Sequence, residues 1–124
     1  MIKPKNTGFT RVRKATIYSV QGLKAAWIHE SAFRQECILG LIMLPLAFWI
    51  AENWVEASVL IAVCFLVLII ELLNSAIEAV VDRVGPEHHD LAGQAKDMGS
   101  AAVMLSLLMA GGTWLLIGGQ RLFG

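Results

Sequence analysis

The sequence predicts an all-α membrane protein with three transmembrane helices and an N-terminal amphipathic surface helix. Of its 124 residues, 56% are hydrophobic and only 16% are charged, which is too apolar for an ordinary soluble domain of this size. Three long apolar runs follow a mixed, basic N-terminal segment. Ten basic and ten acidic residues cancel, so the basic excess typical of nucleic-acid-binding proteins is missing. We therefore expect one membrane-embedded domain, residues 1–124, with no nucleic-acid partner.

The N-terminal segment, residues 9–35, is the predicted surface helix. Apolar Ile17, Leu23 and Trp27 are interspersed with basic side chains at roughly helical spacing, as in a helix lying on an anionic membrane surface. Gly22 weakens the pattern, so one helix or two shorter helices would satisfy it. Because no long apolar run opens the chain, we expect the N-terminus to be retained rather than cleaved as a signal peptide.

The apolar runs predict spans at about 36–52, 55–82 and 97–120, against a hydrocarbon core of roughly 30 Å. Pro45 lies in the first span, where a membrane helix tolerates it with a local kink. The second span continues without a helix breaker into the polar stretch ELLNSAIEAVVD. The third is rich in Gly, Ala and Ser, residues that let membrane helices approach closely.

Basic residues predict the orientation of the chain. They lie before the first span and between the second and third, whereas the 52–56 turn carries only acids. By the positive-inside rule, the N-terminus and the 82–98 loop are cytoplasmic, while the 52–56 turn and the C-terminus lie on the other side. Trp49, Trp54 and Trp114 then fall near the outer interface, as aromatic belts do.

Four polar residues mark the cytoplasmic end of the second span: Glu71, Asn74, Glu78 and Asp82. At 100° per residue they lie within about 80° of one another on one helix face. An ionisable group beside an apolar run is costly unless it is used. Three carboxylates and a carboxamide favour Mg²⁺, which binds one or two protein carboxylates together with waters and phosphates. The alternative is a solvated helix end with an Asn that links helices.

Further polar residues flank this face in the sequence. Glu30 either pairs with Arg34 one turn later or joins the acids, and Glu36 lies where the chain enters the first span. Lys96 is a candidate phosphate-binding cation, and Asp97 a helix N-cap or metal partner.

The histidines and cysteines of the chain are weaker candidates for a metal or catalytic site. His88 and His89 are loop residues without the partners of a zinc site, and Cys37 and Cys64 stand in apolar surroundings as packing residues. The phosphate-binding motifs of P-loop enzymes and protein kinases are missing from the sequence. ATP would therefore need a different phosphate cradle.

Four blocks of sequence resemble the prokaryotic diacylglycerol kinase family of small integral membrane enzymes. They are GFTR (8–11), GLKAAWIHESAFRQE (22–36), ELLNSAIEAVVDR (71–83) and AKDMGSAAV (95–103). Together they cover nearly the whole chain in order. The sequence departs from the usual family pattern at His29, His88 and Gln94, where Asn, Tyr and Arg are usual.

The resemblance implies a homotrimer in a bacterial inner membrane, with its site on the cytoplasmic side, in which MgATP phosphorylates diacylglycerol to phosphatidic acid. It makes Glu71 the proton acceptor and Glu30 and Glu78 the Mg²⁺-binding acids, with Asn74 beside them. It implies nucleotide contacts at Arg11, Tyr18, Glu30, Glu78, Glu87, His88, His89, Lys96 and Asp97. It implies lipid contacts at Arg11, Ser19, Lys24, Ala25, Ala26, Trp27, Ala32, Phe33, Arg34, Gln35, Glu36, Glu71, Ser100 and Trp114.

Three other functions remain open at this point. An undecaprenol kinase would have the same architecture and a different alcohol. A small proton or cation transporter would use the same acids, but transporter sites usually lie near the bilayer midplane, whereas these acids lie at one end of a helix beside a polar loop. A non-catalytic packing subunit would leave the aligned acids without a role. The depth of the acids favours a kinase.

Overall fold

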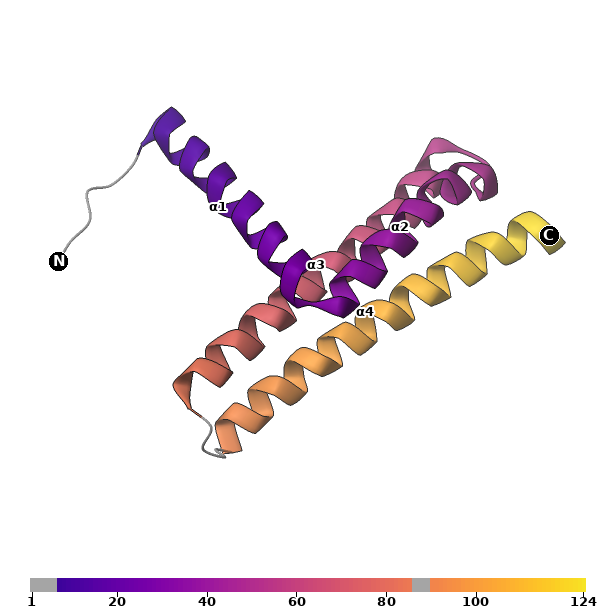
Figure 1. Cartoon of the computed structure of the whole chain (residues 1–124). Helices are drawn as coiled ribbons and strands as arrows, with labels where there is room; N and C mark the ends of the chain where they lie inside the picture. Colours follow the sequence, from indigo (N-terminus) through magenta and orange to yellow (C-terminus); the bar gives the residue numbers. More distant parts are fainter. Residues whose placement is uncertain (1–6, 86–89) are drawn as a thin grey trace.

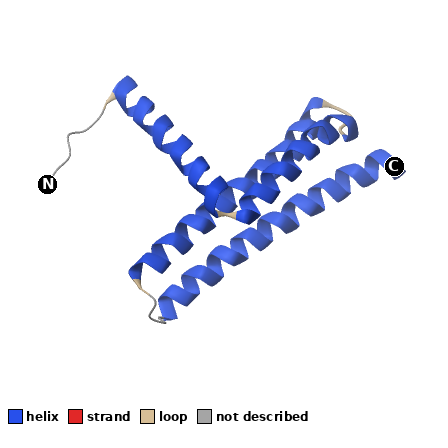
Figure 2. Ribbon diagram, in the orientation of Figure 1, coloured by secondary structure: helices blue, strands red, loops and turns tan. Residues whose placement is uncertain are grey.

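The computed structural model describes residues 7–85 and 90–124, and within them it contains four helices and no strand (Figure 2). They are α1 (Gly8–His29), α2 (Ser31–Ile50), α3 (Trp54–Val84) and α4 (Asp90–Phe123). Helices α2, α3 and α4 run alongside one another, while α1 leaves the bundle at a steep angle (Figure 1). Helix α3 is central, because it packs against both α4 and α2.

Three of the helices are long and apolar enough to cross a membrane, as predicted. They are α2 with 20 residues, α3 with 31 and α4 with 34. At 1.5 Å per residue, α2 spans about 30 Å and α3 about 46 Å. The C-terminal part of α3 and the N-terminal part of α4 therefore extend beyond the N-terminal end of α2 as a two-helix arm (Figure 1).

The boundary between α1 and α2 lies at Glu30, earlier than the predicted boundary at 35–36. Glu30 has extended backbone angles, φ −117° and ψ 104°, which interrupt the helix. Arg34 stabilises the break, because its guanidinium donates hydrogen bonds to the carbonyls of Trp27 (2.7 Å) and Ile28 (3.1 Å) at the end of α1. The predicted Glu30–Arg34 ion pair is absent from the described residues. By contrast, α1 runs unbroken through Gly22, which excludes two shorter helices.

The turn between α2 and α3 is closed by reciprocal hydrogen bonds. The Asn53 side chain caps α3 by accepting from the backbone N–H of Glu56 (2.8 Å), and the Glu56 carboxylate accepts from the N–H of Glu52 (3.2 Å). The rings of Phe48 and Trp54 meet edge to face at 6.2 Å between centroids. Helix α2 continues through Pro45, as a membrane helix allows.

The buried residues of the bundle are mostly small, and they lie chiefly on α3. Leu60, Ala57 and Val63 contribute to this core, with Ala47 from α2 and Ser106 from α4. Large apolar side chains instead point outward along α2 and α4. Close approach of small residues with apolar exteriors is typical of helices that pack in lipid. Both cysteines are free, as expected.

Candidate functional site

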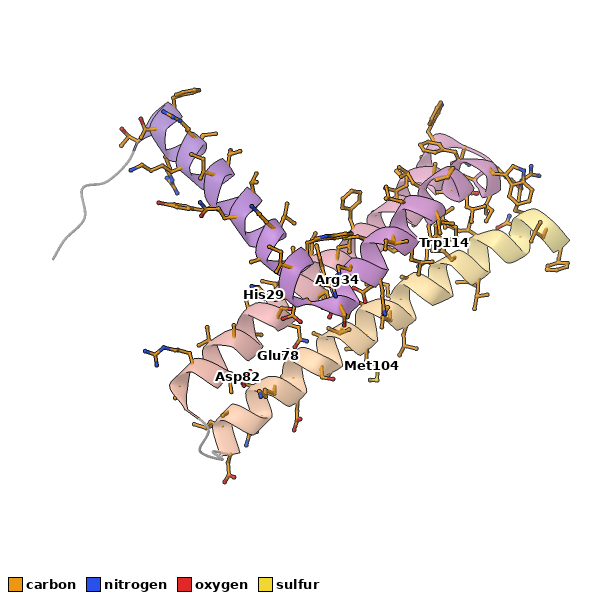
Figure 3. The ribbon with its side chains drawn as sticks, in the orientation of Figure 1. His29, Arg34, Glu78, Asp82, Met104 and Trp114 are labelled. Atoms are coloured by element: carbon orange, nitrogen blue, oxygen red, sulfur yellow. The ribbon has the colours of Figure 1, made fainter. Side chains whose placement is uncertain are left out.

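The polar face of α3 begins near the N-terminal end of α2. It is formed by Glu71, Asn74, Glu78 and Asp82. Among the described residues, Glu71 is the only charged side chain that is buried, at 8% exposed. The Asn74 amide donates a hydrogen bond to the Glu78 carboxylate over 3.1 Å. Glu78 and Asp82 lie on the side of α3 that faces α4 (Figure 3). The predicted common face is therefore present, and its members lie at three different levels of exposure.

Four acids from three different parts of the chain converge at this level. The carboxyl group of Glu36, on α2, lies near that of Glu71 and acts on it electrostatically. The charges of Glu30 and Glu78 also act on Glu71. One oxygen of Glu36, Oε2, is buried without a hydrogen-bond partner. Because like charges in a poorly hydrated site repel, this arrangement requires a proton, a cation or both.

Asn74 occupies the closest approach of α4 to α3. Its carboxamide oxygen Oδ1 is buried and has no hydrogen-bond partner. A Cβ atom added to Gly99 of α4 would overlap that oxygen. Any larger residue at position 99 would therefore require the Asn74 carboxamide to move from this position. The sequence indicated that α4 is rich in small residues, but it gave no indication of which one faces Asn74.

Lys96 joins α4 to the outer end of the polar face. Its ammonium nitrogen lies 2.7 Å from the Asp82 carboxylate, and both side chains are about half exposed. Lys96 was predicted as a phosphate-binding cation, but its partner was not predicted. Asp97 is exposed at the next position of α4 and lies inside the helix, which begins at Asp90, so it is not the predicted N-cap.

Glu30 borders a groove between α1 and α3. The groove has a volume of about 670 Å³ and is also lined by Ser19, His29, Ser75 and Ala76. A second, smaller groove of about 230 Å³ lies among α2, α3 and α4. It is apolar along its length and extends from Glu36 past Met43 to Trp114. Two predicted lipid contacts, Glu36 and Trp114, thus lie at its two ends.

The donor atoms around Glu78 suit a hard divalent cation. They are oxygens of the Glu78 carboxylate and of the Asn74 carboxamide, whose Oδ1 has no hydrogen-bond partner, and the charge of Glu30, at the α1–α2 junction, acts on the neighbouring Glu71. Among residues 7–85 and 90–124, no three His, Cys, Asp or Glu side chains come together closely enough to hold an ion alone. A site with too few protein ligands fits Mg²⁺, which keeps waters and substrate phosphates in its coordination shell.

Other predicted contacts lie far from this cluster within one chain. Arg11 and Tyr18 are 19 and 12 positions before Glu30 on an exposed helix, hence about 28 Å and 18 Å away along α1. Lys24 is exposed on the same helix. The single chain therefore does not bring Arg11 or Tyr18 to the polar face. The predicted nucleotide contacts Glu87, His88 and His89 lie outside the described residues.

The predicted lipid contacts occupy two environments near the α1–α2 junction. Ala26 and Phe33 are buried in the bundle, so their side chains are packing residues within one chain. Trp114 donates its indole N–H to the Leu60 carbonyl over 3.2 Å, which places it against α3. The rest of this set is exposed or half-exposed: Ser19, Lys24, Ala25, Trp27, Ala32, Arg34, Gln35, Glu36 and Ser100.

Known proteins are similar to this chain over nearly its whole length. The chain is 52% identical over 111 residues to a diacylglycerol kinase of Escherichia coli K12, covering 90% of this chain and 91% of the relative. It is 49% identical over 121 residues to a diacylglycerol kinase of Helicobacter pylori 26695, covering 98% and 91%. It is 50% identical over 111 residues to one from Pseudomonas aeruginosa PAO1, covering 90% of each.

A family model described as prokaryotic diacylglycerol kinase matches residues 17–118, a range that contains α2 and α3 entirely and most of α4. The match therefore includes the polar face of α3, Gly99, Lys96 and both acids of the α1–α2 junction. With half of its residues identical to those of several relatives over nine-tenths of its length, the chain belongs to the prokaryotic diacylglycerol kinase family.

Proposed function

We propose that this chain transfers the γ-phosphate of ATP to the free hydroxyl of diacylglycerol, giving phosphatidic acid. Family membership and the names of relatives at 49–52% identity support this activity, and they favour diacylglycerol over undecaprenol as the alcohol. The single observation that carries the proposal is the position of Glu71. It is a buried acid at the level where α2 ends, and hence where the hydroxyl of a membrane lipid meets the aqueous phase.

Glu71 is the proposed proton acceptor. It is the least hydrated acid of the polar face, and the neighbouring carboxyl of Glu36 lies within reach to share or relay a proton. The apolar groove that starts at Glu36 offers acyl chains a surface directly below the reacting hydroxyl. Phosphoryl transfer needs mainly positioning and charge neutralisation from the protein, and a base to accept the hydroxyl proton.

Glu78, Glu30 and the Asn74 oxygen are the proposed Mg²⁺ ligands, and Lys96 the proposed contact to the transferred phosphate. When bound, Mg²⁺ supplies neutralisation of the charge on the phosphates. Lys96 adds a positive side chain at the outer end of the same face, where a nucleotide arriving from water would meet it first.

We further propose a homotrimer in which each site is shared between chains. The support is geometric: α1 carries Arg11 and Tyr18 away from the polar face of its own chain, so another copy is needed to supply those predicted nucleotide contacts. Large exposed apolar side chains along α2 and α4 leave ample surface for helix contacts within the membrane.

The proposed orientation places the N-terminus and the polar arm of α3 and α4 in the cytoplasm, where ATP is present. It depends on the asymmetry of basic residues. A cysteine-reactive, membrane-impermeant label should reach a cysteine placed at residue 54 only from the periplasmic side, in a Cys37→Ala, Cys64→Ala background. Labelling of residue 54 from the cytoplasmic side would overturn this orientation.

The activity itself is tested with radiolabelled ATP and purified protein in mixed micelles containing diacylglycerol or undecaprenol. We expect phosphate incorporation into diacylglycerol, and we expect Glu71→Gln to lower it by about a hundredfold or more. Incorporation into undecaprenol alone would replace the substrate assignment. If a folded protein phosphorylated neither lipid, the small proton or cation transporter would become the better functional assignment.

A further inference from the structure

Asp82 has no role in the function proposed above, although it is part of the polar face. Its carboxylate accepts the Lys96 ammonium at 2.7 Å, in the only salt bridge found within residues 7–85 and 90–124. Both side chains are half exposed, and an exposed pair of this kind contributes little to folding. The pair therefore needs an explanation other than stability.

The register of α3 against α4 shows that the Lys96 side chain is drawn outward. Gly99 meets Asn74, and the two helices run in opposite directions. Lys96 precedes Gly99 by three residues, so its backbone lies about 4.5 Å farther along the helix pair, toward the C-terminal end of α3, at nearly the same height as Glu78. Asp82 lies one more turn of α3, about 6 Å, beyond Glu78 in the same direction. The ammonium thus passes the level of Glu78 to reach Asp82.

Two carboxylates consequently compete for one ammonium. Glu78 precedes Asp82 by one helical turn on the same face, and its charge also acts on Lys96. Without Asp82, the flexible Lys96 side chain would find its next anion at Glu78. A Lys–Glu pair there would occupy the carboxylate that is proposed to bind Mg²⁺, because a bound ammonium and a metal ion need the same oxygens.

We infer that Asp82 is a positioning residue, which holds the Lys96 ammonium away from Glu78 and so leaves the Glu78 carboxylate available to Mg²⁺. The inference rests on the proposed function, since it takes Glu78 as a metal ligand. It also explains how a lysine and a metal-binding acid coexist at one level of the same helix pair. The Asp82 carboxylate acts through Lys96 and contacts neither substrate.

The test is Mn²⁺ titration into purified protein with a non-hydrolysable ATP analogue, followed by the electron paramagnetic resonance signal of free Mn²⁺. Asp82→Asn is expected to weaken Mn²⁺ binding about fivefold, the effect of a partly exposed ion pair competing for the ligand. Asp82→Asn combined with Lys96→Met is expected to bind Mn²⁺ as tightly as Lys96→Met alone, because the competing ammonium is gone. The half-saturating Mg²⁺ concentration for kinase activity should rise in parallel in Asp82→Asn.

Matched variants separate the possible failures. Asp90→Asn removes an exposed carboxylate from the first turn of α4 and should leave Mn²⁺ binding unchanged. Equal weakening by Asp82→Asn with and without Lys96 would make Asp82 a direct ligand or a folding residue and overturn the inference. Unchanged binding in Asp82→Asn would overturn it as well. Unchanged binding in Glu78→Gln, or no binding by the unaltered chain, would instead overturn the proposed metal site.

Discussion

The two halves of the α3–α4 pair treat their polar groups in opposite ways. In the membrane half, Ser106 and Thr113 donate to carbonyls of their own helix, and Trp114 donates to Leu60, so hydrogen-bonding groups are satisfied within the bundle. In the arm beyond α2, Asn74 Oδ1 is buried without a partner, as is Glu36 Oε2 at the junction. Because unpaired buried polar atoms are costly, the second region is built to receive a ligand, whereas the first is built to hold its shape.

The largest effect should come from the acid at the border of the two halves. Glu71→Gln keeps the shape of the side chain and removes its ability to accept a proton, so we expect turnover to fall by about 10²–10⁴-fold, the usual contribution of a general base. The measurement is kcat with diacylglycerol in mixed micelles. Ser106→Ala, a buried polar change in the membrane half, is the control and should keep most of the activity. Comparable losses of turnover in both variants would contradict the assignment of catalysis to one half of the helix pair and structure to the other.

The next effect tests whether one chain forms a complete active site by itself. Arg11→Ala and Glu71→Gln chains, each expected to have very low activity alone, should regain partial activity when mixed, because Arg11 reaches only the site of another chain and random assembly gives about a quarter of shared sites both intact residues. The experiment co-reconstitutes the two variants at several ratios and measures phosphate transfer. Background activity at every ratio, with mixed oligomers verified by two affinity tags, would place Arg11 and Glu71 of each site in one chain.

A smaller effect is expected from Gly99→Ala. The added methyl group collides with the Asn74 carboxamide and must displace it from Glu78, so we expect a loss of about 1–3 kcal/mol in stability, as for overpacking, and a raised Mg²⁺ requirement. Gly111→Ala in the membrane half is a matched control, since a Cβ there meets nothing within 4 Å. Unfolding in a denaturing detergent titration measures both. Equal stability of the two variants would contradict the close contact at Asn74.

The smallest effect belongs to the membrane half. Trp114→Phe removes one interhelical hydrogen bond to Leu60 and keeps most of the aromatic surface, and such bonds average about 0.6 kcal/mol within membranes. The same detergent titration measures the change. A loss several times larger would mean that Trp114 is a main anchor of α4 rather than one contact among many.

Sequence patterns predicted the three spans and the shared face of Glu71, Asn74 and Glu78, because the spans follow from the length of the apolar runs and the face from helical periodicity. The break at Glu30 was placed too late, since the residues around it continue a helical pattern and the break is stabilised by Arg34 reaching back to carbonyls of α1. The pairing of Asp82 with Lys96 was missed for a related reason. It depends on the register between two helices, which is set by one close contact, Gly99 against Asn74, and leaves no spacing signal in the sequence.

The difference in length between α2 and α3 has a consequence for the choice of membrane. With 20 residues, α2 matches a hydrocarbon layer of ordinary thickness, and its N-terminal end is joined to Glu30 and lies near Glu71. A thicker bilayer would draw this junction below the headgroups, and a thinner one would lift it above them, at a cost of fractions of a kcal/mol per Å of mismatch. The length of α2 thus fixes the depth of Glu30 and Glu71 in the bilayer. The acyl-chain length of the surrounding lipids then determines how well the hydroxyl of a lipid substrate lines up with these acids.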